Sequence, residues 1–262
     1  MISKKQIEHI VERYHIKLGR FKYRDGIIDD VQGDVNITNT SLRKLPLKFG
    51  KVNGNFFCHG NKLHNLVGAP HTVTGNFNCS NNQLKSLLGS PKIIGGDFCC
   101  HENDLTSLMG CPKYIFGNFN AFLNKLVTLK GAPEVIEGNC VLFENRLISL
   151  ECGPRYVGQS LYITGNRLKN LVGIPKIIGN MLTIDDRTSL YTGNQNCVVK
   201  RIEINVQGNK KVGYLPKQIL DKQKFLPVVF KYMQHLDIYS PDGNFNQPNF
   251  EDIVFDIEEG LR

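Results

Sequence analysis

The chain has 262 residues, 41% of them hydrophobic, which is enough to bury a core in one or two domains. Its 32 basic and 24 acidic residues give a net charge of +8 without a basic tail, and such a dispersed excess is not by itself typical of nucleic-acid binding. A charged N-terminus and the lack of an 18-residue apolar run argue against a signal peptide and a membrane span. We therefore expect a cytoplasmic protein whose eight cysteines are reduced.

Residues 1–30 are expected to form an N-terminal cap. Ser3 and Gln6 have the spacing of a capping box, which predicts a helix that begins after Ser3. Ile7, Ile10 and Tyr14, together with Val11, form one apolar stripe at helical spacing. We expect this helix to seal the first coil of the domain that follows.

A period of 21 residues without insertions runs through residues 31–186 and predicts seven stacked coils. Leucine pairs mark the coils at Leu42/Leu45, Leu63/Leu66, Leu84/Leu87, Leu105/Leu108, Leu126/Leu129, Leu147/Leu150 and Leu168/Leu171. An asparagine stands two residues before six of these pairs, at Asn61, Asn82, Asn103, Asn124, Asn145 and Asn166. Prolines keep the same spacing at Pro70, Pro91, Pro112, Pro133, Pro154 and Pro175.

Two apolar columns precede each asparagine and alternate with single residues of mixed type. The first is Phe56, Phe77, Phe98, Phe119, Cys140 and Leu161, and the second is Cys58, Cys79, Cys100, Ala121, Leu142 and Ile163. Alternation of period two predicts a short strand with one buried face. The cysteines in these columns are therefore expected to be small core residues.

This pattern resembles the leucine-rich repeat family, because Phe77, Cys79, Asn82 and Leu84 match its two strand hydrophobics, its asparagine and its leucine. The resemblance implies a mainly β, right-handed solenoid with a parallel concave sheet and an asparagine ladder that bonds backbone groups at each bend. A 21-residue coil leaves little room for helices, and the recurring proline favours extended or turn structure on the convex side.

More narrowly, units such as GNFNCSNNQLKSLLGSPKII resemble the leucine-rich repeat proteins encoded by tailed bacteriophages. This resemblance implies that YRDGIIDDVQGDVNI forms a hairpin before the first coil and that LPKQIL and NFEDIVFDIEEGLR belong to a helical tail. It also implies a phage product that acts in the cytosol of an infected bacterium, where it binds and blocks a host protein such as a defence component.

Residues 187–262 are expected to form a small α+β module that caps the last coil. RIEINVQG, residues 201–208, predicts a strand. One or two helices are expected over residues 216–237, with a break or kink at Pro227, and a terminal helix over residues 249–260.

The strand residues that point away from the core form three columns on the predicted concave face. The central column is Asn36, Phe57, Asn78, Cys99, Asn120, Val141, Tyr162 and Thr183. Thr38, His59, Ser80, His101, Phe122, Phe143, Thr164 and Asp185 lie on one side of it, and Asp34, Asn55, Asn76, Asp97, Asn118, Asn139, Ser160 and Asn180 lie on the other. Because these columns contain no lysine or arginine, we do not expect nucleic acid in the groove.

Aromatic side chains gather at one end of this face, where solubility alone would favour polar residues. Exposed aromatic patches mark interaction surfaces, so we predict a protein partner there. The alternative is that one of the caps folds over the patch. The predicted contact residues are Phe57, His59, Asn78, Asp97, Cys99, His101, Asn120, Phe122, Val141, Phe143 and Tyr162.

We predict no catalytic residue, metal or cofactor. His59 and His101 lie two coils apart, roughly 10 Å at about 4.8 Å per strand, which is too far for easy shared coordination. The recurring glycines, such as Gly75 and Gly96, are expected to admit a tight turn before each strand rather than to cradle phosphate. The sequence thus favours a non-enzymatic protein-binding module. Self-assembly or a structural role in the virion, and polyanion binding through basic loop edges, stay open as alternatives.

Overall fold

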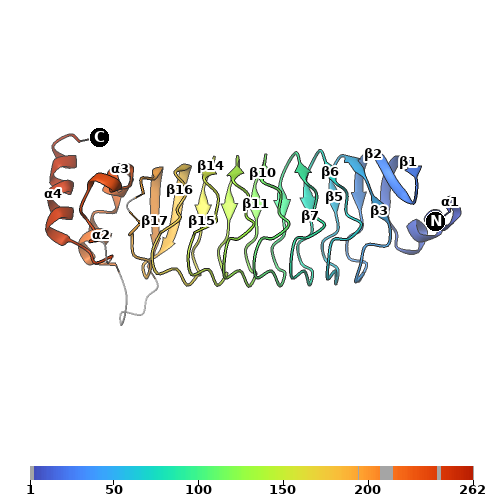
Figure 1. The fold of residues 1–262 in the computed structure, drawn as a ribbon, viewed down its shortest axis with the longest axis horizontal. Coiled ribbons are helices and arrows are strands. Elements are labelled where there is room, and N and C mark those ends of the chain that lie inside the picture. Colours follow the sequence, from blue (N-terminus) through green and yellow to red (C-terminus); the bar gives the residue numbers. More distant parts are fainter. Residues whose placement is uncertain (1–2, 194, 207–214, 241–242, 262) are drawn as a thin grey trace.

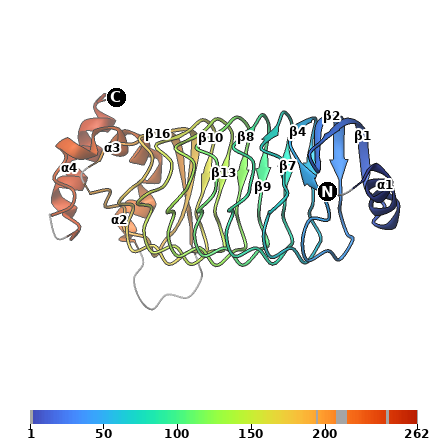
Figure 2. The same ribbon diagram turned by 45° about the vertical axis from the view of Figure 1, so that its right-hand side comes forward.

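The computed structural model describes residues 3–193, 195–206, 215–240 and 243–261. The protein is mainly β and forms a parallel β-solenoid of about eight turns. Figure 1 shows the coils stacked in a row between one N-terminal helix and a group of C-terminal helices, and the turned view in Figure 2 shows the same order. The predicted fold class, with a cap at each end of a repeat solenoid, is confirmed.

The N-terminal helix is α1 (Lys4–Arg13), and its capping box is present as predicted. The Ser3 hydroxyl accepts a hydrogen bond from the Gln6 backbone N–H at 3.3 Å, and the Gln6 side chain accepts one from the Ser3 N–H at 2.7 Å. Ile7 is buried, while Ile10, Val11 and Tyr14 pack against the core. The apolar stripe therefore covers the N-terminal end of the stack.

A hairpin follows, as the family resemblance implied. Strand β1 (Lys17–Arg24) pairs antiparallel with β2 (Ile27–Asn36), and Asp25 and Gly26 turn the chain with φ values of +50° and +83°. Strand β2 also pairs in parallel with β3 (Lys48–Phe49), β4 (Lys51–Asn53) and β5 (Phe56–Phe57). It is thus both an arm of the hairpin and the first strand of the solenoid, and the boundary predicted after residue 30 lies inside it.

Each regular coil contributes two strands of two residues. One row contains β7 (Phe77–Asn78), β9 (Phe98–Cys99), β11 (Phe119–Asn120), β13 (Cys140–Val141) and β15 (Leu161–Tyr162) in line with β5. The other contains β6 (Thr72–Val73), β8 (Ile93–Ile94), β10 (Tyr114–Ile115), β12 (Val135–Ile136) and β14 (Tyr156–Val157) in line with β4. Strand β16 (Ile177–Asp185) joins both rows.

We call the outward surface of the β5-to-β15 row face A and that of the β6-to-β14 row face B. Face A is the surface predicted to be the concave sheet. In both rows, residues 21 apart lie side by side, as Phe77 and Phe98 do. The segments between the rows are loops and bends, in agreement with the extended or turn structure predicted around the prolines.

The core consists of the predicted columns. Phe56, Phe77, Phe98 and Phe119 are fully buried, and their ring centroids follow one another at 5.6, 5.5 and 5.7 Å. The second apolar column and the leucine pairs are buried beside them. This continuous apolar interior is what holds the coils together, since no single coil could bury its hydrophobic side chains alone.

The predicted asparagine ladder is present at the bend after each face A strand. Asn103 is buried, and its side-chain oxygen accepts a hydrogen bond from the Leu84 N–H at 2.9 Å. Its amide nitrogen lies 3.1 to 3.2 Å from the carbonyl oxygens of Cys79, Cys100 and His101. The same bonds recur at Asn82, Asn124 and Asn145, so the ladder joins neighbouring coils.

The C-terminal module begins with β17 (Val198–Asn205), which pairs in parallel with β16. Helices α2 (Lys217–Asp221), η1 (Gln223–Phe225), α3 (Leu226–Tyr232), η2 (Met233–His235) and α4 (Gln247–Glu258) follow. The predicted strand starts three residues earlier than expected, and its last two residues, 207 and 208, lie outside the described part of the chain. The predicted terminal helix is confirmed and begins after Asn246.

The role predicted for Pro227 is wrong. The helical region is interrupted earlier, around Lys222, and Pro227 stands in the first turn of α3. Proline is well tolerated there because the N–H it lacks would have no partner inside the helix.

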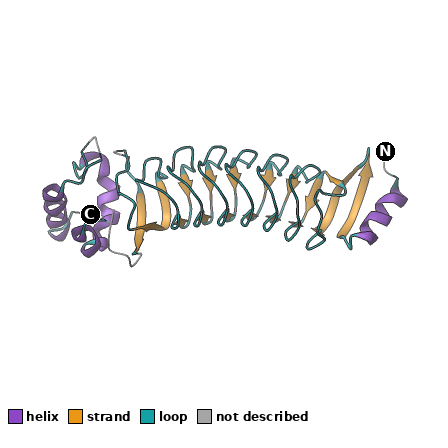
Figure 3. Cartoon of the chain, turned by 90° about the horizontal axis from the view of Figure 1, so that it is seen from below, coloured by secondary structure: helices purple, strands orange, loops and turns teal. Residues whose placement is uncertain are grey.

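Figure 3 shows the helices gathered at the two ends of the chain, so the described parts of the caps do not fold over the middle of face A. Among the described residues, the caps therefore leave the aromatic patch uncovered.

Candidate protein-binding surface

The aromatic end of face A is built around a stack of three rings from successive coils. His101 and Phe122 lie 4.3 Å apart between ring centroids with 7° between their planes, and Phe122 and Phe143 lie 4.7 Å apart with 14°. These spacings are close to the ~4.8 Å between neighbouring strands, so the ladder itself sets the stacking distance. The faces of the Phe122 ring are covered by its neighbours.

The stack is half-buried because its rings cover one another, and neither phenylalanine packs against the hydrophobic core. Val141 and Tyr162 are half-buried in the adjacent column of face A. The structure thus brings four of the predicted contact residues, Phe122, Phe143, Val141 and Tyr162, into one area. His101 extends this area toward the N-terminal coils.

His59 and Phe57 form a separate aromatic pair on face A, with centroids 6.2 Å apart in an edge arrangement. The Nδ1 atom of His59 is buried and has no hydrogen-bond partner. Burial, and secondarily the charge of His101, lowers the pKa of His59. We infer that His59 is neutral at physiological pH. In the described part of the chain, no group of three His, Cys, Asp or Glu side chains is placed to hold a metal ion.

Asp97 belongs to a second ladder along the edge of face A. Its Oδ1 accepts hydrogen bonds from the Asn118 backbone N–H at 2.7 Å and from the Asn118 side chain at 3.0 Å. The same backbone bond to the next coil is made by Asp34, Asn55, Asn76, Asn118 and Asn139. Asp97 thus has a structural task that sequence reasoning missed, although the recurrence of Asn and Asp at this position is a signal that could have revealed it.

This edge ladder also explains the glycines beside it. A Cβ at Gly96 would collide with Oδ1 of Asn76, and one at Gly117 would collide with Oδ1 of Asp97. Neither glycine has a positive φ. The expectation of a tight turn that needs glycine is therefore replaced by a different reason, namely room for the ladder oxygen of the preceding coil.

The polar residues of the central column bond mainly to face A itself. Oδ1 of Asn78 accepts from the Ser80 N–H and hydroxyl at 3.0 and 2.7 Å, and the Asn120 amide lies 3.4 Å from the Cys99 sulfur. Burial raises the pKa of Cys99, so its thiol stays protonated. Asn78, Cys99 and Asn120 are thus placed on the predicted surface but outside its aromatic area.

The eight cysteines, all within the described residues, are free thiols. Burial raises the pKa of the core thiols, including Cys58, Cys79 and Cys100, and this keeps them in the unreactive protonated form. Basic side chains lie on the loops and coil edges, as expected. Those at Lys62, Lys85, Lys92, Lys113, Lys125, Arg146, Arg155, Arg167, Lys169 and Lys176 are exposed.

Face B carries an apolar row that the sequence analysis did not identify. Tyr114, Val135, Tyr156, Ile177 and Val198 are direct ladder neighbours, and Ile93 and Phe116 lie in the same region of the repeat. The signal was available, because these residues alternate with the buried column that contains Ile94 and Ile115. Their outward position follows from the same period-two rule that defines face A.

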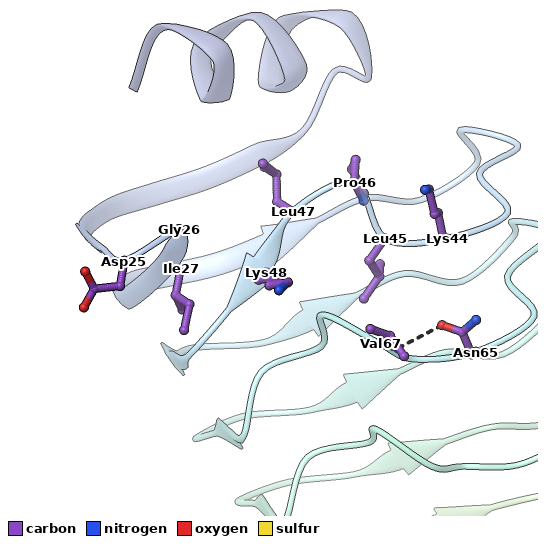
Figure 4. Close-up of a pocket in the computed structure, with 10 residues that line it drawn as sticks. All are labelled: Asp25, Gly26, Ile27, Lys44, Leu45, Pro46, Leu47, Lys48, Asn65 and Val67. Atoms are coloured by element: carbon purple, nitrogen blue, oxygen red, sulfur yellow. Dashed lines mark hydrogen bonds between the residues drawn. The ribbon is translucent and has the colours of Figure 1, made fainter. Parts of the chain in front are cut away.

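A cavity of about 680 Å³ lies at the N-terminal end, where the first coil departs from the repeat. Figure 4 shows its lining, which runs from the hairpin turn to the loops of the first two coils. Five apolar residues line it with two lysines, one aspartate, one asparagine and one glycine: Ile27, Leu45, Pro46, Leu47, Val67, Lys44, Lys48, Asp25, Asn65 and Gly26. Its lining thus combines apolar side chains with charged ones.

In comparisons with known proteins, no family model, curated protein or solved structure matches this chain. Within the described residues, no helix has both the length and the apolar character needed to cross a membrane.

Proposed function

We propose that the chain is a non-enzymatic protein-binding module and that the aromatic end of face A is its contact surface. The observation that carries this proposal is the stack of His101, Phe122 and Phe143 beside Val141 and Tyr162. Aromatic side chains on a surface supply much of the binding free energy in protein interfaces. Stacking also fixes the rings before binding, which lowers the entropic cost of association.

The surroundings of the stack favour a protein over a nucleic acid. Face A has no lysine or arginine in its three columns, whereas a phosphate backbone requires them along its path. The rings are stacked on one another, so their edges rather than their broad faces are available to a partner. Aliphatic side chains and carbonyl oxygens are the groups that suit such edges, since the ring edge carries partial positive charge.

The proposal also concerns the identity of the partner. The repeat resembles leucine-rich repeats, and more narrowly those encoded by tailed bacteriophages. This resemblance supports a role in the bacterial cytosol, in which the chain binds and blocks a host protein, including a component of antiviral defence. That role would need only a rigid surface, which the two ladders and the continuous core provide.

The test is affinity capture from bacterial lysate with immobilised protein and quantitative mass spectrometry. The variant Phe122→Ser/Phe143→Ser removes the stack, and Val67→Ser/Leu88→Ser removes two exposed apolar residues from other loops as a matched control. We expect the control to enrich the same protein as the wild type and the stack variant to lose it. Equal enrichment by all three proteins would reject the aromatic end of face A as the contact surface.

A further inference from the structure

Face B carries an exposed apolar row outside the proposed contact surface. Its row, which we call the face B stripe, consists of Ile93, Tyr114, Phe116, Val135, Tyr156, Ile177 and Val198. Ile93, Phe116 and Val198 keep 51%, 56% and 51% of their surface exposed. Tyr114 and Phe116 lie side by side with ring centroids 4.5 Å apart. A contiguous apolar row of this kind marks an interaction site rather than scattered surface residues.

Positive charge borders the stripe along one side. The residue just before each stripe position is basic in four coils, at Lys92, Lys113, Arg155 and Lys176, and all four are exposed. The border is interrupted at Val198, which follows the buried Cys197, and at Val135, which follows Glu134. The Glu134 carboxylate lies 3.0 Å from the Lys113 amino group. A partner for this face should therefore combine apolar side chains with acidic ones.

Helix α4 of this same chain has that composition. It contains no lysine or arginine, and Glu251, Asp252 and Asp256 are exposed. Phe255, which is 62% exposed, lies on the same side of the helix because residues 251, 252, 255 and 256 are separated by one turn. Phe255 also lines a cavity of about 390 Å³ with Phe250 and Val254, between α2 and α4.

The dimensions of the two surfaces agree. Helix α4 has 12 residues and is therefore about 18 Å long at 1.5 Å per residue. The stripe from Tyr114 to Val198 covers four ladder steps, or about 19 Å at 4.8 Å per step. Figures 1 and 2 place α4 at the far C-terminal end, beyond β17, so the α4 that covers this length of face B has to come from another copy.

We propose that the chain associates with itself by docking α4 of one copy onto the face B stripe of a second copy. Phe255 and the cavity beside it receive the projecting Tyr114 and Phe116 side chains, and the α4 carboxylates face the basic border. Because two different surfaces meet, the contact is heterologous and leaves one α4 and one stripe unused in each pair. The assemblies therefore grow longer as the concentration rises, unless the copies form a closed ring.

Sedimentation velocity on the purified chain tests this proposal over a range of about 10 to 300 μM, a span suited to a weak contact between small surfaces. We expect the sedimentation coefficient to rise with concentration at low salt and to rise less at high salt, where the charges are screened. The variant Tyr114→Ser/Phe116→Ser should weaken association by about tenfold or more. The variant Phe122→Ser/Phe143→Ser should associate like the wild type, which separates this contact from the proposed function of face A.

Charge reversal gives the decisive comparison, because every changed residue is exposed and folding can be checked by circular dichroism. Lys92→Glu/Arg155→Glu/Lys176→Glu reverses the border, and Glu251→Lys/Asp252→Lys/Asp256→Lys reverses α4. Each variant alone should stay monomeric, and an equimolar mixture should associate. A wild type that is monomeric throughout at low salt would overturn the proposal. So would association that neither reversal changes, since it would use another surface.

Discussion

Faces A and B are made by the same 21-residue unit, yet their outward side chains differ in chemistry and in what they bond to. On face A, many polar residues bond to the backbone, as Asp97 does to Asn118. On face B, the outward residues between the proline and the next glycine are apolar in most coils, as at Ile93 and Tyr156. The difference shows that the polar residues repeated on face A are part of the architecture. Surface chemistry free for function lies in outward side chains that do not bond to the backbone.

The cause is a change in backbone pairing between the two rows. The Gly75 N–H donates to Gly54 in the preceding coil at 2.9 Å, while the Phe77 N–H donates to Asp97 in the following coil at 2.9 Å. The Asn76 N–H lies between them at the corner, and the side chain of Asn55 accepts it at 2.7 Å. Face A therefore needs an Asn or Asp at its edge in nearly every coil.

The largest effect is expected for Asn103→Ala at the bend beside face A. The substitution leaves three carbonyl groups and the Leu84 N–H without their side-chain partner, so we expect a loss of about 4 kcal/mol in the free energy of unfolding. Asn120→Ala, in the half-buried central column, should cost less than about 1 kcal/mol. Urea unfolding measures both losses, and similar values would refute the distinction between the ladder asparagines and those of the central column.

A second pair compares the two faces within one coil. Asp97→Ala removes the acceptor of the Asn118 N–H and should cost about 2 kcal/mol, whereas Ile93→Ala on face B should stay within about 0.5 kcal/mol because its side chain is exposed. Chemical denaturation of the two variants under the same conditions provides the check. If Ile93→Ala were the more destabilising, face B would be part of the core rather than a free surface.

A smaller, stabilising effect is expected at Cys152. This residue has φ +62° and occupies the position where Gly68, Gly89, Gly110, Gly131 and Gly173 stand in other coils, all with positive φ. Cys152→Gly should raise the free energy of unfolding by about 0.5 to 1 kcal/mol, since relief of left-handed strain outweighs the added entropy of the unfolded chain. Thermal unfolding can measure this gain, and a lower midpoint would show that Cys152 is not strained.

The smallest effect concerns pH and is confined to face A. The folded-state pKa of His59 lies below its ordinary value of 6.5, so the unfolded chain takes up this proton first as the pH falls. The associated stability is complete above about pH 6.5 and is lost as the pH drops toward the folded-state pKa. His59→Gln should reduce this loss between pH 7.5 and 5.5, and an unchanged pH dependence would remove His59 as its source.

Much of this molecule could be predicted from the sequence because the period places each residue on a known side of the backbone. The buried phenylalanine column, the ladder at Asn103 and the capping box at Ser3 all follow from local rules. The edge ladder at Asp97 could not be derived so directly, since it depends on how the backbone changes partner between two coils. The start of α3 at Leu226, just before Pro227, likewise depends on packing in the C-terminal module.

The central claim is that face A and face B have separate partners, and capture from lysate with one variant of each face tests it most directly. Phe122→Ser/Phe143→Ser should lose the captured protein, while Tyr114→Ser/Phe116→Ser should retain it at the wild-type level. Retention by the face A variant together with loss by the face B variant would contradict the account, because it would move the partner to the apolar stripe.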